Sequence, residues 1–195
     1  MTRIAVVVGS TRPNRLAPAV ARWVLGVAAT RPGAVHELLD VADFDLPLYD
    51  EPWPAMVGSY EGAHTRRWAD AVASYDGFVV VTGEYNHGPP AALKNALDYL
   101  YAEWNDKPIG FVGFGGAGGA RAVEQLRLNS IELRMAPVAA SVGLVSATDF
   151  ASHTEIAPTA GRDAQVHTLL DQVETWARAL ASVRGGGITA SPVAR

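Results

Sequence analysis

The sequence predicts one α/β domain built on a parallel β-sheet that helices cover on both faces. Segments rich in β-branched residues alternate along the chain with segments whose apolar residues recur at helical spacing. The strand-like segments are almost continuously apolar, which is typical of strands buried on both faces. The chain has 195 residues, of which 49% are hydrophobic, and this is enough for one domain with a full core.

The first part of the chain predicts two strands and one helix. Residues 3–9, RIAVVVG, form a continuous β-branched run and are predicted to be a buried strand. Apolar residues then recur at helical spacing from Leu16 to Ala28, and Pro18 falls in the first turn, where its missing N–H costs little. Residues 34–41, AVHELLDV, are predicted to be the second strand, and a proline-rich loop follows them.

The middle of the chain predicts a helix, a strand and a longer helix. Residues 61–75 are predicted to be helical, and residues 77–82, GFVVVT, are predicted to be the third strand. The helix predicted at 89–104 starts with two prolines and carries a broad apolar face. That face consists of Leu93, Ala96, Leu97, Leu100, Tyr101 and Trp104.

The last part of the chain predicts two further strands, each followed by a helix. The strands are expected at 108–115, PIGFVGFG, and at 136–142, APVAASV. A less regular helix is expected at 119–133, and a helix with a clean apolar stripe at 162–183. Residues 1–184 are therefore predicted to form the domain, and residues 185–195, rich in glycine, a flexible tail.

Composition excludes several classes of function. The net charge is −4 and no long run of one sign occurs, which argues against nucleic acid or an anionic membrane as the main partner. No segment approaches the length of an apolar membrane span, and the N-terminus does not resemble a signal peptide, so a cytoplasmic protein is expected. Cysteine is absent and the five histidines lack the spacing of metal ligands, so no metal site is expected.

Polar and glycine-rich segments follow three of the predicted strands. In a parallel sheet covered by helices, ligands bind beyond the carboxyl ends of the strands, where the strand order reverses. The loops that follow Val8, Thr82 and Phe114 are therefore the candidates for a binding site.

The loop at 9–15, GSTRPNR, leads from the first strand into the first helix. Ser10, Thr11 and Asn14 supply side-chain donors, Arg12 and Arg15 supply positive charge, and the start of the helix supplies free N–H groups. These groups together can bind an anion, although a capped helix with solvated arginines would give the same sequence.

The kind of anion follows from what this loop lacks. It has no GxxxxGK[ST] pattern, which argues against nucleoside triphosphates, and no GxGxxG pattern of a dinucleotide site. Side chains occupy the space that a dinucleotide pyrophosphate needs, so a terminal monophosphate is the expected ligand group. Asp40 lies too far along the chain for the ribose-binding acid of a dinucleotide fold and is interpreted as a surface residue.

The second loop, GEYNHGPP, follows the third strand. It places the backbone amides of Glu84, Tyr85 and Asn86 at the end of that strand, and the two prolines stiffen the entry to the next helix. A flat heteroaromatic ring needs such a rigid edge of donors and acceptors. Glu84 is interpreted as a solvated or helix-capping carboxylate rather than a catalytic one, and His87 as a structural hydrogen bonder rather than an acid or base.

The third loop, GFGGAGGAR, follows the fourth strand. Five glycines in nine positions allow the close approach of a ligand or of another loop, but they also allow tight turning alone. Arg121 at its end can start the next helix or reach a partner surface.

The three segments together resemble the NADPH-dependent FMN reductase family, a flavodoxin-like group that includes quinone and chromate reductases. GSTRPNR is similar to the family's phosphate loop, GEYNHGPPAALKNALDYL to its second motif, and GGAGGARAVEQLR to its third. The resemblance implies a five-stranded parallel sheet in the order 2-1-3-4-5. The family usually has proline where this chain has Gly83, which bears on the affinity for FMN.

Position by position, the resemblance implies a set of FMN-binding residues. The phosphate loop is expected to surround the phosphate and ribityl chain, the second loop to line the isoalloxazine largely through backbone groups, and the third loop to close the site. The residues implied are Ser10, Thr11, Arg12, Asn14, Arg15, Leu16, Thr82, Gly83, Glu84, Tyr85, Asn86, His87, Gly115 and Gly116. No catalytic residue is assigned, because the chemistry belongs to the flavin.

The implied function is an FMN-containing oxidoreductase that takes hydride from NADPH or NADH and passes it to a quinone, free flavin or similar acceptor. The resemblance also implies a homodimer or homotetramer formed through the helices after the third and fourth strands, to which Tyr101 and Trp104 could contribute. Two alternatives remain at this point. One is a flavodoxin-like electron carrier without nicotinamide turnover, and the other is a binding protein that kept the fold but lost FMN.

Overall fold

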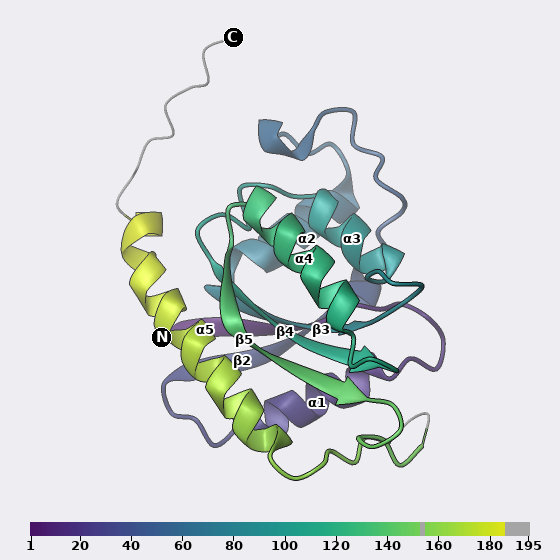
Figure 1. Cartoon of the computed structure of the whole chain (residues 1–195). Coiled ribbons are helices and arrows are strands. Elements are labelled where there is room, and N and C mark those ends of the chain that lie inside the picture. The colour runs from purple at the N-terminus through teal and green to yellow at the C-terminus, as the bar shows by residue number, and fades with distance from the viewer. Residues whose placement is uncertain (153–154, 186–195) are drawn as a thin grey trace.

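The chain folds around a five-stranded parallel sheet, shown in the computed structural model in Figure 1. The structure describes residues 1–152 and 155–185. In space the strands lie in the order β2-β1-β3-β4-β5, and every neighbouring pair is parallel, so the predicted α/β class and strand order are confirmed. The strands are β1 (Thr2–Val8), β2 (Ala34–Asp40), β3 (Gly77–Gly83), β4 (Pro108–Gly115) and β5 (Ala136–Val145).

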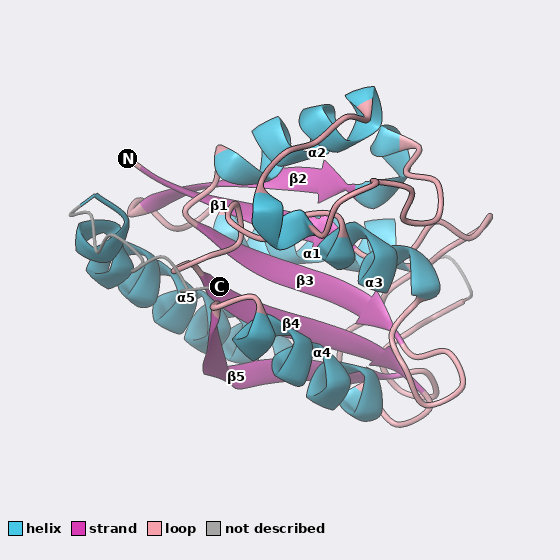
Figure 2. Cartoon of the chain, turned by 90° about the horizontal axis from the view of Figure 1, so that it is seen from above, coloured by secondary structure: helices cyan, strands magenta, loops and turns pink. Residues whose placement is uncertain are grey.

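Helices form one layer on each face of the sheet (Figures 1 and 2). Each layer packs against the sheet and buries a separate hydrophobic cluster. The first layer contains α1 (Ala17–Ala28) and α5 (Arg162–Gly185). The second contains α2 (Ala63–Ala73), α3 (Ala91–Asp98) and α4 (Ala120–Glu132). Because both faces are covered, the side chains of β3 are buried along its whole length, as its continuous apolar run predicted.

The helix predicted at 89–104 ends early, at Asp98, and irregular turns lead from there to β4. The carbonyl of Leu97, one residue before the end of the helix, accepts bonds from the N–H groups of Tyr99 and Leu100 and, at 3.2 Å, from the Trp104 indole. The turns allow Tyr99, Leu100 and Trp104 all to reach the core, where each is at most 2% exposed. Trp104 is therefore buried within its own chain and is not available to a second subunit.

Other boundaries differ by a few residues. Strand β5 continues beyond the predicted end at 142 because its last residues pair with the end of β4, as in Gly115 with Val145. Helix α5 continues through Gly185, one residue into the predicted tail, and the rest of that tail, 186–195, lies outside the described residues. In the described ranges, no helix is both long enough and apolar enough to cross a membrane.

The proline-rich segment between β2 and α2 is held against α3 by polar contacts. The carboxylate of Asp50 accepts a 2.9 Å hydrogen bond from the Tyr99 hydroxyl. Glu51 accepts bonds from the N–H groups of Glu61 and Gly62, at 2.8 and 2.9 Å, so it satisfies amides just ahead of α2. This explains why α2 begins at Ala63 rather than at 61.

The connection from β5 to α5 is anchored by one buried carboxylate. Asp149 is fully buried and accepts bonds from the N–H of Val145 at 2.8 Å and from the N–H and hydroxyl of Thr159 at 2.9 and 2.8 Å. Arg162, at the start of α5, forms an ion pair with the same carboxylate at 3.1 Å. The two ends of this connection are therefore joined at a single side chain.

Candidate active site

The loops after β1, β3 and β4 lie next to one another at the carboxyl edge of the sheet, where all the arrows of Figure 2 point. The strands end in register, with Val8 beside Val81 and Gly83 beside Phe114. A hydrogen bond of 3.0 Å from the Gly9 N–H to the Val81 carbonyl fixes the first loop against β3. The structure thus brings together the three segments that the sequence singled out.

Glycine is required at the start of the first loop. A Cβ atom on Gly9 would stand 2.9 Å from the carbonyl oxygen of Val81 and 2.8 Å from Cδ2 of Leu93. Both distances are shorter than normal contacts, so a side chain would push the loop away from β3 and α3. The absence of a Cβ therefore determines where the rest of the loop lies.

Ser10 carries a buried hydroxyl that has no hydrogen-bond partner within residues 1–152 and 155–185. The residue is only 1% exposed, and it lies between the end of β1 and the start of α1. A buried polar group without a partner costs about 1–3 kcal/mol. A ligand oxygen bound at this loop would recover that free energy, so Ser10 fits the predicted role of binding a phosphate.

The two arginines of this loop have different environments. Arg15 donates to both carboxylate oxygens of Asp40, at 2.8 and 2.7 Å, and also to the carbonyl of Ser10. Arg12 is exposed and has no ion-pair partner in the described part of the chain. Arg12 is therefore available to bind an anion, whereas the bonds of Arg15 to Asp40 hold the loop against the end of β2.

The interpretation of Asp40 as a surface residue is wrong. Asp40 is 9% exposed, and besides pairing with Arg15 it accepts a 3.0 Å bond from the N–H of Ala42. That second bond caps a short 3₁₀ helix, Val41–Phe44. This role was not predicted from the sequence. Two signals were available, namely an acidic residue at the end of a buried strand and an arginine at the end of the neighbouring loop.

The loop after β3 forms a tight two-residue turn. The N–H of Tyr85 bonds to the carbonyl of Gly88 at 2.9 Å, and the N–H of Gly88 bonds back to the carbonyl of Tyr85 at 3.1 Å. Asn86 and His87 between them have φ angles of 49° and 74°, which matches a type I′ turn. Left-handed backbone at a residue other than glycine costs of order 1–3 kcal/mol and persists only where surrounding structure imposes it.

Gly83 is the last residue of β3 and pairs with Phe114 rather than belonging to the turn. A Cβ atom on Gly83 would stand 3.2 Å from the ring of Phe114, which itself packs against Phe150 with 6.2 Å between ring centroids. The aromatic ring of Phe114 therefore occupies space beside the position where the family usually has proline.

Glu84 is a buried helix-capping carboxylate, one of the two roles that the sequence left open. Its side chain is 7% exposed, pairs with the guanidinium of Arg121 and accepts a 3.1 Å bond from the Arg121 N–H at the start of α4. Burial alone would raise the pKa of Glu84, but the bonds from the Arg121 side chain and backbone lower the pKa below its ordinary value. Glu84 is therefore ionised and is a poor proton donor.

His87 is also held by α4. Its carbonyl accepts a 2.6 Å bond from Nε2 of Gln125, and its ring nitrogen Nδ1 lies 3.4 Å from a guanidinium nitrogen of Arg121. These contacts support the interpretation of His87 as a structural residue. The role of Gln125 could not be predicted from the sequence, because a helical glutamine is ordinarily a solvated residue.

The glycines of the third loop divide into two kinds. A Cβ atom on Gly113 would stand 2.6 Å from the Gly118 carbonyl oxygen, and one on Gly119, where φ is 72°, would stand 2.7 Å from the Phe114 nitrogen. Tight turning therefore explains these residues. Gly116 is different, since nothing lies within 4 Å of a Cβ placed there. Gly116 thus leaves open space at the surface of this loop.

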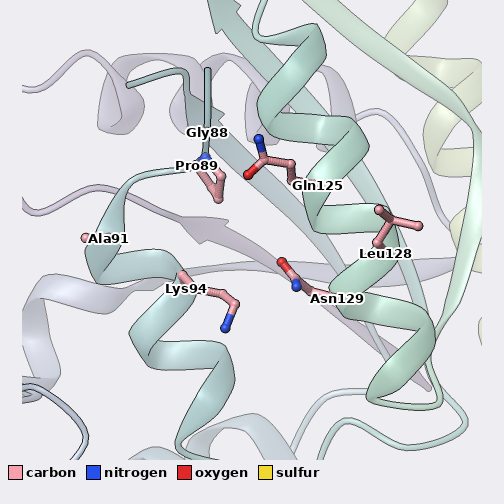
Figure 3. A pocket seen from close by; sticks show the side chains of 7 residues that line it. All are labelled: Gly88, Pro89, Ala91, Lys94, Gln125, Leu128 and Asn129. Carbon is pink, nitrogen blue, oxygen red and sulfur yellow. The ribbon is translucent and has the colours of Figure 1, made fainter. Parts of the chain in front are cut away.

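Cavities border the first and second loops. A groove of about 440 Å³ lies between α3 and α4 beside Gly88 and Pro89, with Gln125 and Leu128 on its other side (Figure 3). Two smaller cavities flank the first loop, one of about 120 Å³ next to Thr11 and one of about 340 Å³ next to Leu16. The first loop is therefore accessible from both sides.

The site can bind a monophosphate and a flat ring at one edge of the sheet. The unpartnered hydroxyl of Ser10 and the free guanidinium of Arg12 suit a phosphate, and the rigid turn at 84–88 and the open space at Gly116 suit a ring. Fold and site define a flavodoxin-like protein whose loops fit a flavin mononucleotide.

Comparison with known sequences then identifies the family. The sequence pattern of the NADPH-dependent FMN reductase family matches residues 2–149, and the chain belongs to that family. An NAD(P)H-dependent FMN reductase of Schizosaccharomyces pombe is 42% identical over 139 residues, covering 69% of this chain and 70% of the relative. A 2-hydroxy-1,4-benzoquinone reductase of Burkholderia is 34% identical over 132 residues, covering 64% and 68% of the two chains.

Solved structures share the fold at lower sequence identity. FerB of Paracoccus denitrificans, a flavoenzyme NAD(P)H:(acceptor) oxidoreductase, superposes with a TM-score of 0.70 at 22% identity, over 90% of this chain and 98% of its own. An oxidoreductase of Corynebacterium diphtheriae gives a TM-score of 0.68 at 15% identity, over 92% and 98%. These similarities confirm the flavodoxin-like fold.

Proposed function

We propose that the protein holds FMN across the loops after β1, β3 and β4 and passes hydride from NAD(P)H through that flavin to a small acceptor. Membership of the family makes it an FMN-dependent NAD(P)H oxidoreductase. The observation that supports the position of the cofactor best is the buried, unpartnered hydroxyl of Ser10 beside the unpaired Arg12, within the described residues. Bound FMN would supply the hydride-transfer chemistry.

The first loop would bind the phosphate end of the cofactor. Ser10, Thr11 and Asn14 donate hydrogen bonds, and Arg12 neutralises charge. Arg15 acts on the loop itself, because its guanidinium is already bonded to Asp40 and to the Ser10 carbonyl. Leu16 borders the cavity beside this loop and would pack against the ribityl chain.

The second and third loops would bind the ring. Thr82 and Gly83 end the strand beneath it, and the turn from Glu84 to His87 presents backbone groups to it. Tyr85 is 40% exposed, so its ring is available for stacking. Gly115 lies against Glu84, and the open space beside Gly116 would leave one face of the flavin accessible to the donor and acceptor in turn.

None of these side chains is assigned as an acid or base. Glu84 is ionised and paired with Arg121, and the carbonyl and ring of His87 are both engaged by α4. The chain's contribution is to bind and orient the cofactor and to stabilise charge on it through backbone N–H groups. Proton exchange is then left to solvent at the open face.

The names of the relatives support a proposal for the acceptor and donor. The names of those relatives include FMN reductases and quinone reductases, so we propose a quinone or free flavin as acceptor and either NADPH or NADH as donor. Arg15 and Arg121 are both occupied by buried carboxylates, which disfavours them as ligands of a 2′-phosphate. Arg12 is the arginine of the three loops that remains unpaired in the described structure.

We also propose that the protein is a cytoplasmic homodimer or homotetramer. The groove between α3 and α4 is bordered on α4 by Leu128, which is 70% exposed, and Ile131 on the same helix is 63% exposed. Exposed apolar groups beside a groove are typical of a subunit contact. Light scattering should give a mass of two or four chains, and Leu128→Glu should shift it toward one.

An absorption spectrum of the purified protein, followed by assays with both nicotinamides and a quinone, tests the proposed function. We expect a flavin spectrum and turnover that depends on bound FMN. A yellow protein without nicotinamide turnover would make it an electron carrier instead. A colourless protein that takes up no added FMN would overturn the proposal in favour of a binding protein.

A further inference from the structure

We infer that Glu84 and Arg121 are positioning residues that join the loop after β3 to the start of α4 and thereby set the turn that faces the flavin. This inference rests on the proposed position of FMN for its functional consequence. The pair itself, which we call the loop clamp, is a property of the protein without ligand.

Glu84 caps α4 from a different loop. The residue that precedes this helix, Gly119, has no side chain to accept a bond from the free amides of the first turn. Glu84 comes from a different loop and fills that role, accepting from the Arg121 N–H at 3.1 Å. The Arg121 amide therefore has this partner only while the loop after β3 is docked on α4, whereas the Ala120 amide bonds to the Ala117 carbonyl of its own loop.

The carboxylate member of the pair is buried. The Glu84 side chain is 7% exposed, and its carboxylate is bonded to both the side chain and the backbone of Arg121. A buried charge that loses its partner is strongly unfavourable, so loss of the Arg121 guanidinium would leave the Glu84 carboxylate in a poor environment, whereas the Arg121 side chain is 42% exposed. The clamp thus acts as a unit and not as two independent contacts.

Helix α4 also supports the turn after β3. Asn86 and His87 adopt left-handed backbone, which needs support from outside the turn. The same helix supplies it, because Gln125 bonds to the His87 carbonyl at 2.6 Å and a guanidinium nitrogen of Arg121 lies 3.4 Å from the His87 ring. Strand β3 by itself does not fix the conformation of residues 85–88.

The consequence is a division of roles between side chain and backbone. The side chain of Glu84 faces α4, so the loop offers its backbone to the ligand. Loss of the clamp should allow the turn to relax and weaken FMN binding.

The test compares Glu84→Gln, Arg121→Gln and the double variant with a control, Arg134→Gln. Arg134 forms an exposed ion pair with Asp106 at 3.2 Å, in the connections that precede β4 and β5, so it matches the charge change without touching the site. Dissociation constants for FMN are measured by flavin fluorescence, and amide hydrogen exchange over residues 84–88 is measured on the apo-protein. Arg121→Lys is included as the conservative variant.

We expect each single Gln variant to raise the dissociation constant for FMN at least tenfold and to speed amide exchange at 84–88. The double variant should resemble the singles rather than multiply them, and Arg121→Lys should restore part of the affinity. The inference would be wrong if both single variants matched Arg134→Gln in FMN affinity and in amide exchange. It would also be wrong if the loss of FMN affinity in the double variant equalled the product of the losses in the two single variants.

The exchange measurement separates this inference from the proposed function. If the wild-type protein binds no FMN, the proposed function fails, yet faster exchange at 84–88 in the single variants would still support the clamp. If the wild type binds FMN and exchange in the apo-protein is unaffected by both single changes, the clamp is wrong and the proposed function stands. A variant that does not fold is replaced by Arg121→Lys, for which the same exchange measurement decides.

Discussion

The loops after β1 and β3 both contain an arginine–carboxylate pair, but they leave different groups unsatisfied. In the first loop, Arg15 pairs with Asp40, while the Ser10 hydroxyl and the Arg12 guanidinium have no partner among the described residues. In the second loop, the Glu84 carboxylate and the His87 carbonyl accept bonds from side chains of α4. The carbonyls of Tyr85 and Gly88 each accept a bond from the other residue's N–H. The first loop is thus built to receive hydrogen bonds from a ligand, and the second to keep a shape.

The difference suggests how a flavoprotein can bind a flexible phosphate and a rigid ring with one sheet edge. A phosphate needs free donors, which cost stability until the ligand arrives. A ring needs backbone groups at fixed positions, which cost strain and therefore need support from a neighbouring helix. Variants in the two loops should therefore differ in whether they change FMN affinity or the free energy of unfolding.

The largest effect is expected for Gly9→Ala, which would move the whole first loop. The added Cβ would meet the Val81 carbonyl oxygen at 2.9 Å. We expect the free energy of unfolding to fall by about 1–3 kcal/mol, and displacement of the binding groups to weaken FMN binding by about 100-fold or more. Chemical denaturation and fluorescence titration measure the two effects.

The control for that variant is Gly26→Ala in α1. Nothing lies within 4 Å of a Cβ at Gly26, so alanine should stabilise the helix by up to about 1 kcal/mol. FMN affinity should be unchanged in this control. Equal FMN affinity in Gly9→Ala and wild type would mean that the first loop does not bind the cofactor.

Arg12→Ala should give the next largest effect, and it should act on binding alone. Arg12 is exposed and unpaired in the described structure, so its loss should leave the unfolding free energy nearly unchanged. Removal of a charge-assisted hydrogen bond to phosphate should weaken FMN binding by about 1.5–3 kcal/mol. Arg22→Ala on α1, also exposed, is the control, and an affinity loss as large in that variant would assign the effect to general electrostatics.

Arg15→Gln should give the opposite pattern. Its guanidinium holds Asp40 at 2.7 and 2.8 Å in a mostly buried position, so we expect the free energy of unfolding to fall by about 1–3 kcal/mol. FMN affinity should fall less than in Arg12→Ala, because Arg15 is committed to the protein. Titration and denaturation of both variants side by side decide this, and a greater loss of affinity in Arg15→Gln would reverse the roles assigned to the two arginines.

Acid should loosen the second loop, with the smallest effect of the series. The pKa of Glu84 is lowered in the folded protein by its bonds to Arg121, despite burial that opposes this. Its stabilising contribution is therefore present above the unfolded pKa of about 4.3 and is lost as the pH falls below that value. Apo-protein exchange at 84–88 should speed up below this pH in the wild type, and the same acid-dependent change in Glu84→Gln would show that another group is responsible.

Much of the fold followed from local patterns. The continuous apolar runs of β1, β3 and β4 predicted buried parallel strands, because only such strands place every side chain against a helix layer. Helical periodicity identified α1, α4 and α5 to within a few residues. The helix at 89–104 was too long because its apolar positions continue past Asp98, and periodicity cannot distinguish a helix from a turn that buries the same residues.

The site was predictable at the level of loops and less so at the level of side chains. Topology brings the ends of β1, β3 and β4 together, so the three loops could be found from sequence. The partners of Arg15 and Glu84 could not, because Asp40 and Arg121 lie 25 and 37 positions away and their contacts exist only in the folded chain. Binding of FMN by these residues stays a prediction.

Because Asp149 bonds to both ends of the connection between β5 and α5, the chain between those ends can change in length at a small entropic cost. Both flanks of that segment meet at one carboxylate, so a graft inserted between them would start from a closed and fixed base. The entropic cost of lengthening a loop grows only slowly once its ends are held together. An insertion between Asp149 and Thr159 should therefore leave the ends of β5 and α5 in place, provided that Phe150 stays packed against Phe114.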